Sequence, residues 1–305
     1  MISTSGRPGV GGEAAPSHKY SRLLLWVIPA IVALVPFLAV LAIPAFVVIY
    51  GVRAHDIIAL MVSYCLVMLG TTLGYHRLLA HKSLKLAPSV RYPLIVLGAM
   101  AAQGPPGFWV AHHRAHHGDP DGPLDPHSPA AVGSAGTDGV SRFLHAHIGW
   151  MFGIGGRYDG RFVRDIRRDP ATLMVEKHYF KWVIAGLLLP AVAVLPLHGT
   201  NFGFLQSIYW AGLVRLGFSH QATWLVNSAC HLWGYRNFET PDSSRNNWFV
   251  AALTLGEGWH NNHHADPARA CHGVGKWDFD PTFTTASFLE VMGLARDFAP
   301  PIATH

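Results

Sequence analysis

Residues 57–75 read IIALMVSYCLVMLGTTLGY, and the chain continues without a break into HRLLAH at 76–81. The first stretch carries no charged side chain over 19 residues, and about 20 apolar residues are enough for a helix to cross a bilayer. The second stretch places two histidines directly after this apolar helix. The sequence therefore predicts a membrane span at about 56–75 that ends in side chains with a functional role.

Three further apolar segments predict spans at about 23–50, 182–198 and 202–226. Hydrophobic residues make up 50% of the chain and charged residues only 13%, whereas soluble domains carry about 25% charged residues. This composition excludes a soluble cytosolic domain, and it excludes disorder, which needs low hydrophobicity and high charge. Arg215 lies inside the last span, and we expect it to turn toward the helix bundle or to reach the interface.

The remaining segments predict a tail and a cap. Residues 1–22 are rich in Gly, Ser and Pro and predict a disordered tail, followed by a single membrane domain over 23–305. The cap consists of 76–181 and 227–305. Within it, residues 92–102 are apolar but too short to cross, so we expect a re-entrant or interfacial helix there. The expected fold class is an all-α membrane protein with four transmembrane helices and a helical cap.

The distribution of Lys and Arg predicts the orientation of these spans. Of the 23 basic residues, 13 lie between positions 77 and 181 and five follow position 227. The positive-inside rule then places the cap and both termini in the cytoplasm, and we expect a multi-pass protein of a bacterial inner membrane. The net charge of +5 suits an anionic membrane surface, but basic residues scattered among apolar segments argue against nucleic-acid binding. The three scattered cysteines predict no disulfide framework.

Histidine is unusually frequent, with 20 in 305 residues, and it gathers in four groups. The groups are HRLLAH (76–81), HHRAHH (112–117), NSACH (227–231) and GEGWHNNHH (256–264). Residues at i, i+3 and i+4 share one face of a helix. This spacing aligns His113, His116 and His117; His260, His263 and His264; and Asn227 with His231. His76 and His81 are five residues apart and need a helix end to reach one centre.

Nine histidines near the predicted cytoplasmic surface are too many for one ion and suit two first-row metal ions. Imidazole is compatible with iron, zinc and copper, so the ligand type does not select the metal. Carboxylates, which soluble di-iron bundles use as ligands, are nearly absent from the groups. His112 is set aside because the H-x-x-H-H register selects His113. The isolated histidines are interpreted as surface or core residues: His18, His55, His178, His198, His272 and His305.

Several motifs together resemble the integral-membrane fatty acyl desaturases of the stearoyl-CoA (delta-9) type, fatty acid desaturase type 1. The resemblance runs from about residue 23 to the C-terminus, with matching order and distances. The motifs that carry it are HRLLAH (76–81), HRAHH (113–117), DPHSP (125–129), HAHIGWMF (145–152), ATWLVNSACH (222–231) and GEGWHNNHH (256–264).

The resemblance implies four transmembrane helices and a cytoplasmic cap that holds a non-haem di-iron centre with two Fe²⁺ ions. The family's ligands correspond to His76, His81, His113, His116, His117, His231, His260, His263 and His264, with Asn227 reaching one iron through water. The resemblance also implies a bent apolar tunnel and places Gln103, Trp109, Thr223 and Trp224 at the bend. The alternative roles are interfacial anchoring for the two tryptophans and a helix back-bond for Thr223.

The implied reaction is the oxygen-dependent insertion of a cis double bond, expected at delta-9, into a saturated acyl chain of acyl-CoA or membrane lipid. An unactivated methylene has no acidic proton, so acid–base catalysis cannot remove its hydrogens, and the metal supplies that chemistry. Oxygen leaves as water, and two electrons arrive from outside. The sequence has no cytochrome b5-like H-P-G-G segment, so we expect a separate donor of the ferredoxin or cytochrome b5 type.

Two other functions compete with this interpretation. Alkyl or lipid hydroxylases of the wider membrane di-iron group share two H-x-x-H-H boxes, but they usually lack N-S-x-x-H followed by G-E-G-W-H-N-N-H-H. A non-catalytic metal transporter would place polar ligands along the spans, and the spans here lack them. Analysis of the product, an alkene or an alcohol, separates the two enzymes.

One departure from the family concerns the acyl carrier. In animal acyl-CoA desaturases, the box that corresponds to 113–117 is preceded by Ala-Arg-Asp, which helps to hold the CoA head group. This chain has Val110, Ala111 and His112 there, and it has Gly104 where those enzymes place an Asn. Phosphates are recognised by Arg forks or Lys point charges. We therefore predict an acyl chain on a membrane lipid, although a basic cluster could take the place of the missing Arg: Arg157, Arg161, Arg164, Arg167 and Arg168.

Overall fold

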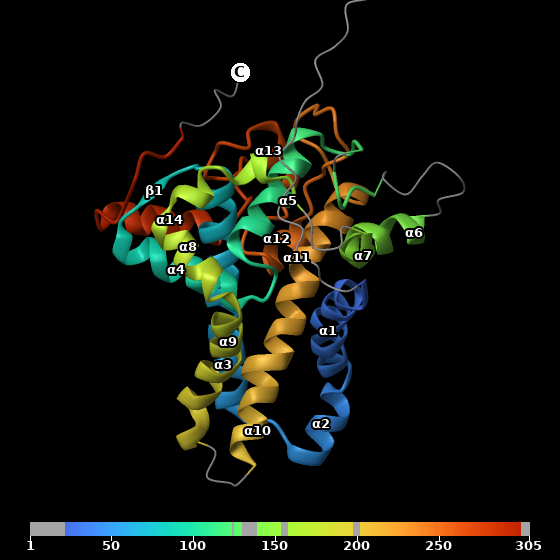
Figure 1. The fold of residues 1–305 in the computed structure, drawn as a ribbon, viewed down its shortest axis with the longest axis vertical. Helices are drawn as coiled ribbons and strands as arrows, with labels where there is room; N and C mark the ends of the chain where they lie inside the picture. Colours follow the sequence, from blue (N-terminus) through green and yellow to red (C-terminus); the bar gives the residue numbers. More distant parts are fainter. Residues whose placement is uncertain (1–21, 124, 130–138, 154–157, 198–201, 300–305) are drawn as a thin grey trace, which may run out of the picture.

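The apolar segments fold into four helical runs that lie together as a stalk (Figure 1). The computed structural model of the chain describes residues 22–123, 125–129, 139–153, 158–197 and 202–299. In chain order the runs are α1 (Arg22–Leu41) with α2 (Ile43–Tyr50), α3 (Ala54–Leu69) with η1 (Gly70–Ala80), α9 (Tyr179–Val194) with η5 (Leu195–Leu197), and α10 (Gly203–Ser207) with η6 (Ile208–Val214) and α11 (Arg215–Leu232). The predicted tail, apart from Arg22, lies outside the described residues.

Two of these runs have the length and apolar composition of membrane spans, and a third has them if its two bent parts are counted as one. Ala54–Ala80 and Tyr179–Leu197 each qualify as one helix. The first run qualifies as a single span only if its two parts are taken together, because they are bent by 53°. Pro44 near the start of α2 explains this bend, since proline lacks the N–H that would bond to the preceding turn.

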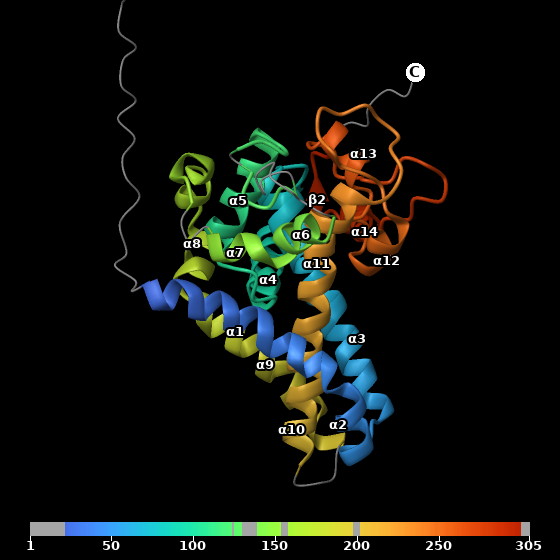
Figure 2. The same cartoon turned by 90° about the vertical axis from the view of Figure 1, so that its right-hand side faces the viewer.

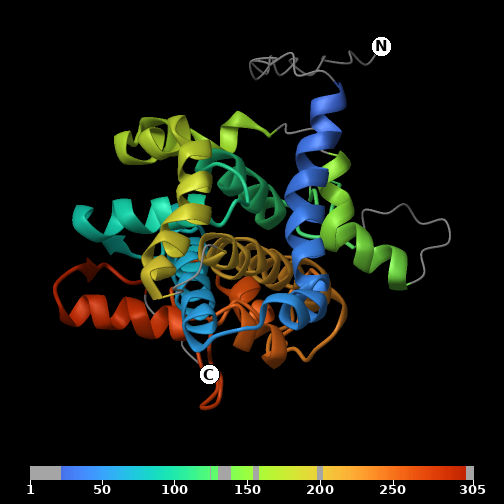
Figure 3. The same cartoon turned by 90° about the horizontal axis from the view of Figure 1, so that it is seen from below.

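The fourth run is a helical stretch from Gly203 to Leu232, but its composition is less apolar than that of the other three. Arg215 lies near its centre, other polar residues such as Gln206 and His220 lie in the same run, and the Arg215 side chain is fully buried among the helices. This is the inward orientation expected from the sequence. Seen from the end of the stalk, the fourth run lies between the first and third runs (Figure 3).

Large apolar side chains are exposed along all four runs. A soluble monomer rarely leaves such a continuous apolar surface uncovered, so the stalk has the surface of a membrane-embedded bundle. Examples are Trp26, Leu38, Val48, Ile49, Ile58, Phe180, Leu189 and Leu205.

The remaining elements form a cap at one end of the stalk, and α3 and α11 run up into it (Figure 2). The cap helices are α4 (Pro88–Met100), α5 (Pro106–Gly118), α6 (Gly139–Leu144), η2 (His145–Gly149), α7 (Trp150–Gly153), η3 (Gly160–Val163), η4 (Ile166–Arg168), α8 (Pro170–Lys177), α12 (Trp248–Leu253), α13 (His260–Ala265) and α14 (Pro281–Val291). The expectation of a purely helical fold needs one small correction. β1 (Lys85–Leu86) pairs antiparallel with β2 (Ala295–Arg296).

A close helix contact joins the stalk to the cap. A Cβ atom on Gly70 would lie 2.2 Å from the backbone nitrogen of Gly98, and one on Gly74 would lie 2.8 Å from the carbonyl oxygen of Leu94. Only glycine permits η1 and α4 to approach this closely. The contact fixes α4, the 13-residue helix that contains most of the predicted non-crossing segment, beside the end of the second run.

Candidate metal centre

Helix α5 presents one continuous histidine face. It begins with Pro106, whose fixed φ and missing N–H suit a first helical position. Trp109, His113, His116 and His117 follow at intervals of four, three and one, so all four side chains point to the same side. This face confirms the helical spacing predicted for the second histidine group.

The five-residue spacing of His76 and His81 is resolved by a π-helix. Residues Gly70–Ala80 form a π-helical turn, and the amide of His81 donates to the carbonyl oxygen of His76 at 3.0 Å. An i to i+5 bond brings residues five apart onto one face, and the two imidazole rings lie 4.8 Å apart. The sequence predicted that a helix end would bring His76 and His81 together. In the structure, the π-helical hydrogen-bond spacing at the end of η1 does so.

The two remaining groups come from the C-terminal half of the chain. His231 lies one residue before the end of α11, and His260, His263 and His264 lie on the short helix α13. The asparagines within HNNHH hold this helix in place. Asn261 accepts hydrogen bonds from the amides of residues 237 and 238, and Asn262 accepts one from the side chain of Asn246.

The nine histidines predicted as ligands separate into two sets in the structure. Within each set, the candidate ligand atoms all lie within 4.8 Å of one another. We call them the five-histidine set and the four-histidine set. The five-histidine set is His76, His81, His113, His117 and His263. The four-histidine set is His116, His231, His260 and His264.

In both sets the Nε2 atoms point inward. The distance between Nε2 atoms is 3.1 Å for His76 and His263 and 3.0 Å for His117 and His263. In the four-histidine set it is 3.1 Å for His116 and His264, and 3.0 Å for His231 and His260. Two ligands about 2.1 Å from a first-row ion lie about 3 Å apart at a right angle, so these spacings fit nitrogen ligands of one ion.

Carboxylates hold the opposite nitrogen of several of these rings. The Nδ1 atom of His116 lies 2.7 Å from Asp125, and that of His264 lies 2.9 Å from Asp242. The Nδ1 atom of His76 lies 2.5 Å from Glu257, which also pairs with the fully buried Arg77 at 3.3 Å. A carboxylate on Nδ1 fixes the tautomer and the ring orientation of a metal-binding histidine and leaves Nε2 free to bind.

Burial keeps many of these imidazoles neutral. Burial and the neighbouring histidines hold the pKa of five rings well below the usual range. The same causes lower the pKa of His264 to about 4 despite the opposing effect of Asp242. Neutral imidazole is the form that binds metal. The five rings are His81, His113, His117, His260 and His263.

The contact between His116 and His264 provides a direct test of whether a cation fits. Both rings donate from Nδ1 to a carboxylate, so in a neutral imidazole neither Nε2 carries a hydrogen. With both rings in the neutral form that binds metal, two lone pairs face each other at 3.1 Å. A bound cation turns this unfavourable contact into a favourable one, so the donor set fits a metal ion.

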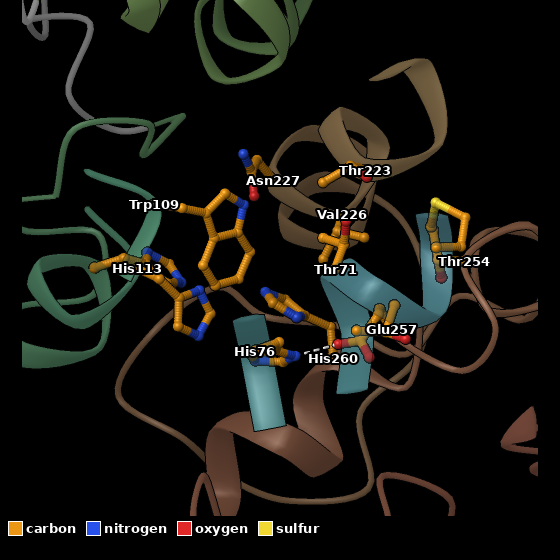
Figure 4. A pocket seen from close by; sticks show the side chains of 13 residues that line it. Thr71, His76, Trp109, His113, Thr223, Val226, Asn227, Thr254, Glu257 and His260 are labelled. Atoms are coloured by element: carbon orange, nitrogen blue, oxygen red, sulfur yellow. Dashed lines mark ion pairs between the residues drawn. The ribbon is translucent and has the colours of Figure 1, made fainter. Parts of the chain in front are cut away.

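A cavity of about 50 Å³ lies against both sets (Figure 4). His76 and His113 of the five-histidine set and His116 and His260 of the four-histidine set contribute to its wall. Asn227, the residue predicted to act through water, also lines it. A cavity of this size holds a few water molecules or a short length of alkyl chain, so the full-length acyl tunnel stays a prediction.

The four residues predicted at the tunnel bend separate into two groups. Trp109 and Thr223 line the cavity, and Trp109 stacks on His113 with ring centroids 5.0 Å apart. The side chain of Gln103 donates to Thr223 at 2.9 Å and so lies beside them. Trp224 is buried elsewhere, between the rings of His147 and His220.

The sequence model of the fatty acid desaturase family matches residues 54–278, which include every histidine of both sets. The chain belongs to the fatty acid desaturase family. A fatty acid desaturase is an oxidoreductase that uses oxygen and acts on a fatty acyl substrate, and the two histidine sets of this desaturase are compatible with metal binding.

Curated relatives of this desaturase act on several acyl carriers. An sn-1 stearoyl-lipid 9-desaturase from Anabaena variabilis is 38% identical over 243 residues, which is 79% of this chain and 82% of that protein. An acyl-CoA 5-desaturase from Anemone leveillei is 38% identical over 242 residues, or 77% and 69% of the two chains. A hex-5-enoyl-[acyl-carrier protein] acetylenase from Moorena producens is 35% identical over 256 residues, or 83% and 80%.

The carboxylates that lie behind the histidine sets were not among the residues predicted from the sequence. Asp125 lies inside the motif DPHSP and Glu257 inside GEGWHNNHH. Their presence in these motifs is the feature of the sequence that could have identified them as partners of the histidines. Asp242 lies in a loop without any periodic pattern. His272 was interpreted as a surface or core residue, and it is buried, with its ring 4.4 Å from that of His263.

Proposed function

We propose that this desaturase introduces a cis double bond, at delta-9, into a saturated acyl chain of a membrane lipid, with two iron ions held by the two histidine sets. One observation carries the proposal. Two sets of inward-facing Nε2 atoms, several of them held from behind by carboxylates, share a cavity with Trp109 and Thr223. Iron bound there supplies the oxidising power that removes hydrogen from an unactivated methylene.

The chain's own residues supply position and exclude water. The cavity side of Trp109, stacked on His113, provides an apolar wall for an alkyl chain beside the five-histidine set. Thr223 and Val226 on α11 provide the opposite wall (Figure 4). Because most of these histidines are buried, water has little access to the site. The two electrons come from a separate protein, of the ferredoxin or cytochrome b5 type.

The function is tested by expressing the chain in a host that lacks unsaturated fatty acids and analysing the lipids by mass spectrometry. When the host also supplies a functional electron donor, we expect a cis-monounsaturated acyl chain to appear in its lipids. An alcohol in place of the alkene would support the hydroxylase instead. The relatives described above are named for forming double or triple bonds, which favours the alkene.

We further propose four membrane crossings, with the cap and both termini in the cytoplasm of a bacterial cell. The exposed apolar side chains on α10 and α11, such as Leu205 and Phe218, support the fourth crossing although its composition is less apolar. The inward-facing Arg215 lowers the cost of placing a charge at membrane depth.

Cysteine labelling tests this orientation. A cysteine at Thr200, which precedes α10 in the chain and lies outside the described residues, should react with an impermeant reagent in intact cells. A cysteine at Ser141, which is exposed on α6 of the cap, should react only after the cells are opened. The reverse pattern would place the histidine sets on the outside and contradict the proposed topology.

Residues 110–112, which lack the Arg and Asp of the animal acyl-CoA desaturases, support a membrane lipid rather than CoA as the acyl carrier. Val110, Ala111 and His112 are buried, and the Nδ1 atom of His112 lies 2.8 Å from the carbonyl oxygen of Phe108 on the same helix. No cation from this stretch is available for a phosphate. Of the alternative basic cluster, Arg157 lies outside the described residues, and Arg161 pairs with Asp159 at 2.6 Å.

The carrier prediction is tested with purified enzyme, a matched electron donor, and stearoyl-CoA and stearoyl phospholipid offered side by side. We expect faster turnover of the phospholipid, and little change when Arg161, Arg164, Arg167 and Arg168 are replaced by glutamine. The acyl-CoA interpretation would be restored if the wild type turned over the CoA ester faster than the phospholipid and if replacing the four arginines lowered that rate. Rates are compared by mass spectrometry of the released acyl chains.

A further inference from the structure

The turn between α4 and α5, residues 101–105, has a constrained backbone. Ala102 has φ of 55° and Gly104 has φ of 109°, conformations that non-glycine residues rarely adopt and that need support from their surroundings. Gln103 lies between them, and its side chain donates to Thr223 at 2.9 Å. The conformation of this turn therefore decides where Gln103 and Thr223 meet beside the cavity.

Arg215 holds the start of this turn. Its guanidinium donates from one nitrogen to the carbonyl oxygen of Met100 at 3.0 Å and from another to that of Gly186 at 2.7 Å. The side chain is fully buried, and none of the ion pairs among the described residues includes it. Its partners are therefore backbone carbonyls, one of them at the C-terminal end of α4, where a helix carries partial negative charge.

His220 holds the next residue. Its Nε2 atom lies 2.8 Å from the carbonyl oxygen of Ala101, so Nε2 carries the hydrogen and donates it. The ring is buried and stacks on Trp224 with centroids 5.2 Å apart. On the opposite side of the turn, the amide of Gly104 donates to the hydroxyl of Tyr179 at 2.9 Å.

These contacts follow one order along α11. Arg215 binds residue 100, His220 binds residue 101, and Thr223 binds residue 103. The same helix continues to Asn227 beside the cavity and to His231 of the four-histidine set. The turn is thus tied, residue by residue, to the helix that carries part of the metal site.

We propose that Arg215 and His220 are positioning residues that fix the turn carrying Gln103 and thereby determine which carbon atoms of the acyl chain lie beside the metal site. The inference rests on the proposed function. Arginine suits this contact because its guanidinium donates from two separate nitrogens, one to each helix, whereas the three N–H groups of lysine all leave from a single nitrogen. A looser turn leaves the bend of the acyl chain less well defined, so the double bond forms at more than one position.

The test compares His220→Phe, His220→Gln and Arg215→Lys with the wild type. Phenylalanine keeps the ring against Trp224 but removes the Nε2 donor, whereas glutamine restores a donor with a similar reach. Gln206→Met is the matched control, since Gln206 is a buried polar residue on the same run that donates to the carbonyl oxygen of Tyr50, far from the turn. Each variant is assayed for bound metal, total desaturation and double-bond position.

We expect His220→Phe and Arg215→Lys to keep at least about half of the bound metal while more than about a tenth of the product carries a displaced double bond. His220→Gln and Gln206→Met should give the single wild-type isomer. If His220→Phe gives only the wild-type isomer, the inference is overturned. If the Arg215→Lys protein does not accumulate in the membrane, the result from His220→Phe alone decides the test. Absence of any unsaturated product from the wild type would instead contradict the proposed function.

Discussion

Replacing His117 of the five-histidine set or His260 of the four-histidine set with alanine should abolish desaturation. Each change removes one inward-facing nitrogen from a set whose candidate ligand atoms all lie within 4.8 Å of one another. Losing an outer-shell partner already costs about 10- to 100-fold in affinity or activity, so loss of a ligand should cost at least about 100-fold. The same should hold for His113, His231 and His264.

The controls for this series are His112→Ala and His178→Ala. His112 is turned away from both sets and bonds to the carbonyl oxygen of Phe108, and His178 bonds to that of Met174 at the end of α8. Both variants should keep most of the activity, with equal amounts of protein in the membrane. Wild-type rates from two or more of the five ligand variants would show that the histidine sets are not the metal site.

Replacing Asp125 or Asp242 with asparagine should weaken metal binding by about 10- to 100-fold. Burial by itself would raise the pKa of each carboxyl, but charge and hydrogen bonds from the surrounding histidines hold both values below the usual range. Both groups are therefore ionised at neutral pH and place negative charge behind His116 and His264. Asparagine keeps the size of the side chain and removes this charge.

Metal content after dialysis against a chelator measures this effect directly. Asp297→Asn is the matched control, because Asp297 is an exposed aspartate of the cap that pairs with Lys85. It should retain as much metal as the wild type. If Asp242→Asn and Asp125→Asn also retained wild-type metal under the same chelator, the carboxylates would have no role in metal binding.

The helical grouping of the histidines was predictable from the sequence because it is local. His113, His116 and His117 lie on one helix, and helical spacing alone brings them to one face. The separation of the nine histidines into sets of five and four was not predictable, because each set draws on three segments far apart in the chain. His116 and His117, which are adjacent in sequence, belong to different sets.

The carboxylates and the fourth run illustrate what local patterns cannot provide. Asp242 reaches His264 through a loop that Asn261 and Asn262 hold in place. No helical or strand periodicity in the sequence predicts this contact. The role of Arg215 depends on carbonyl oxygens of two other helices. The sequence predicted only that its charge would avoid lipid.

The most direct test of the central claim combines metal analysis and product analysis on one purified preparation. The wild-type chain, produced with iron and supplied with oxygen, electrons and stearoyl phospholipid, should contain two iron ions per chain and yield a cis-alkene. His260→Ala should lose iron and product together. Desaturation by a preparation free of iron, or an alcohol as the main product of the iron-loaded wild type, would contradict the account.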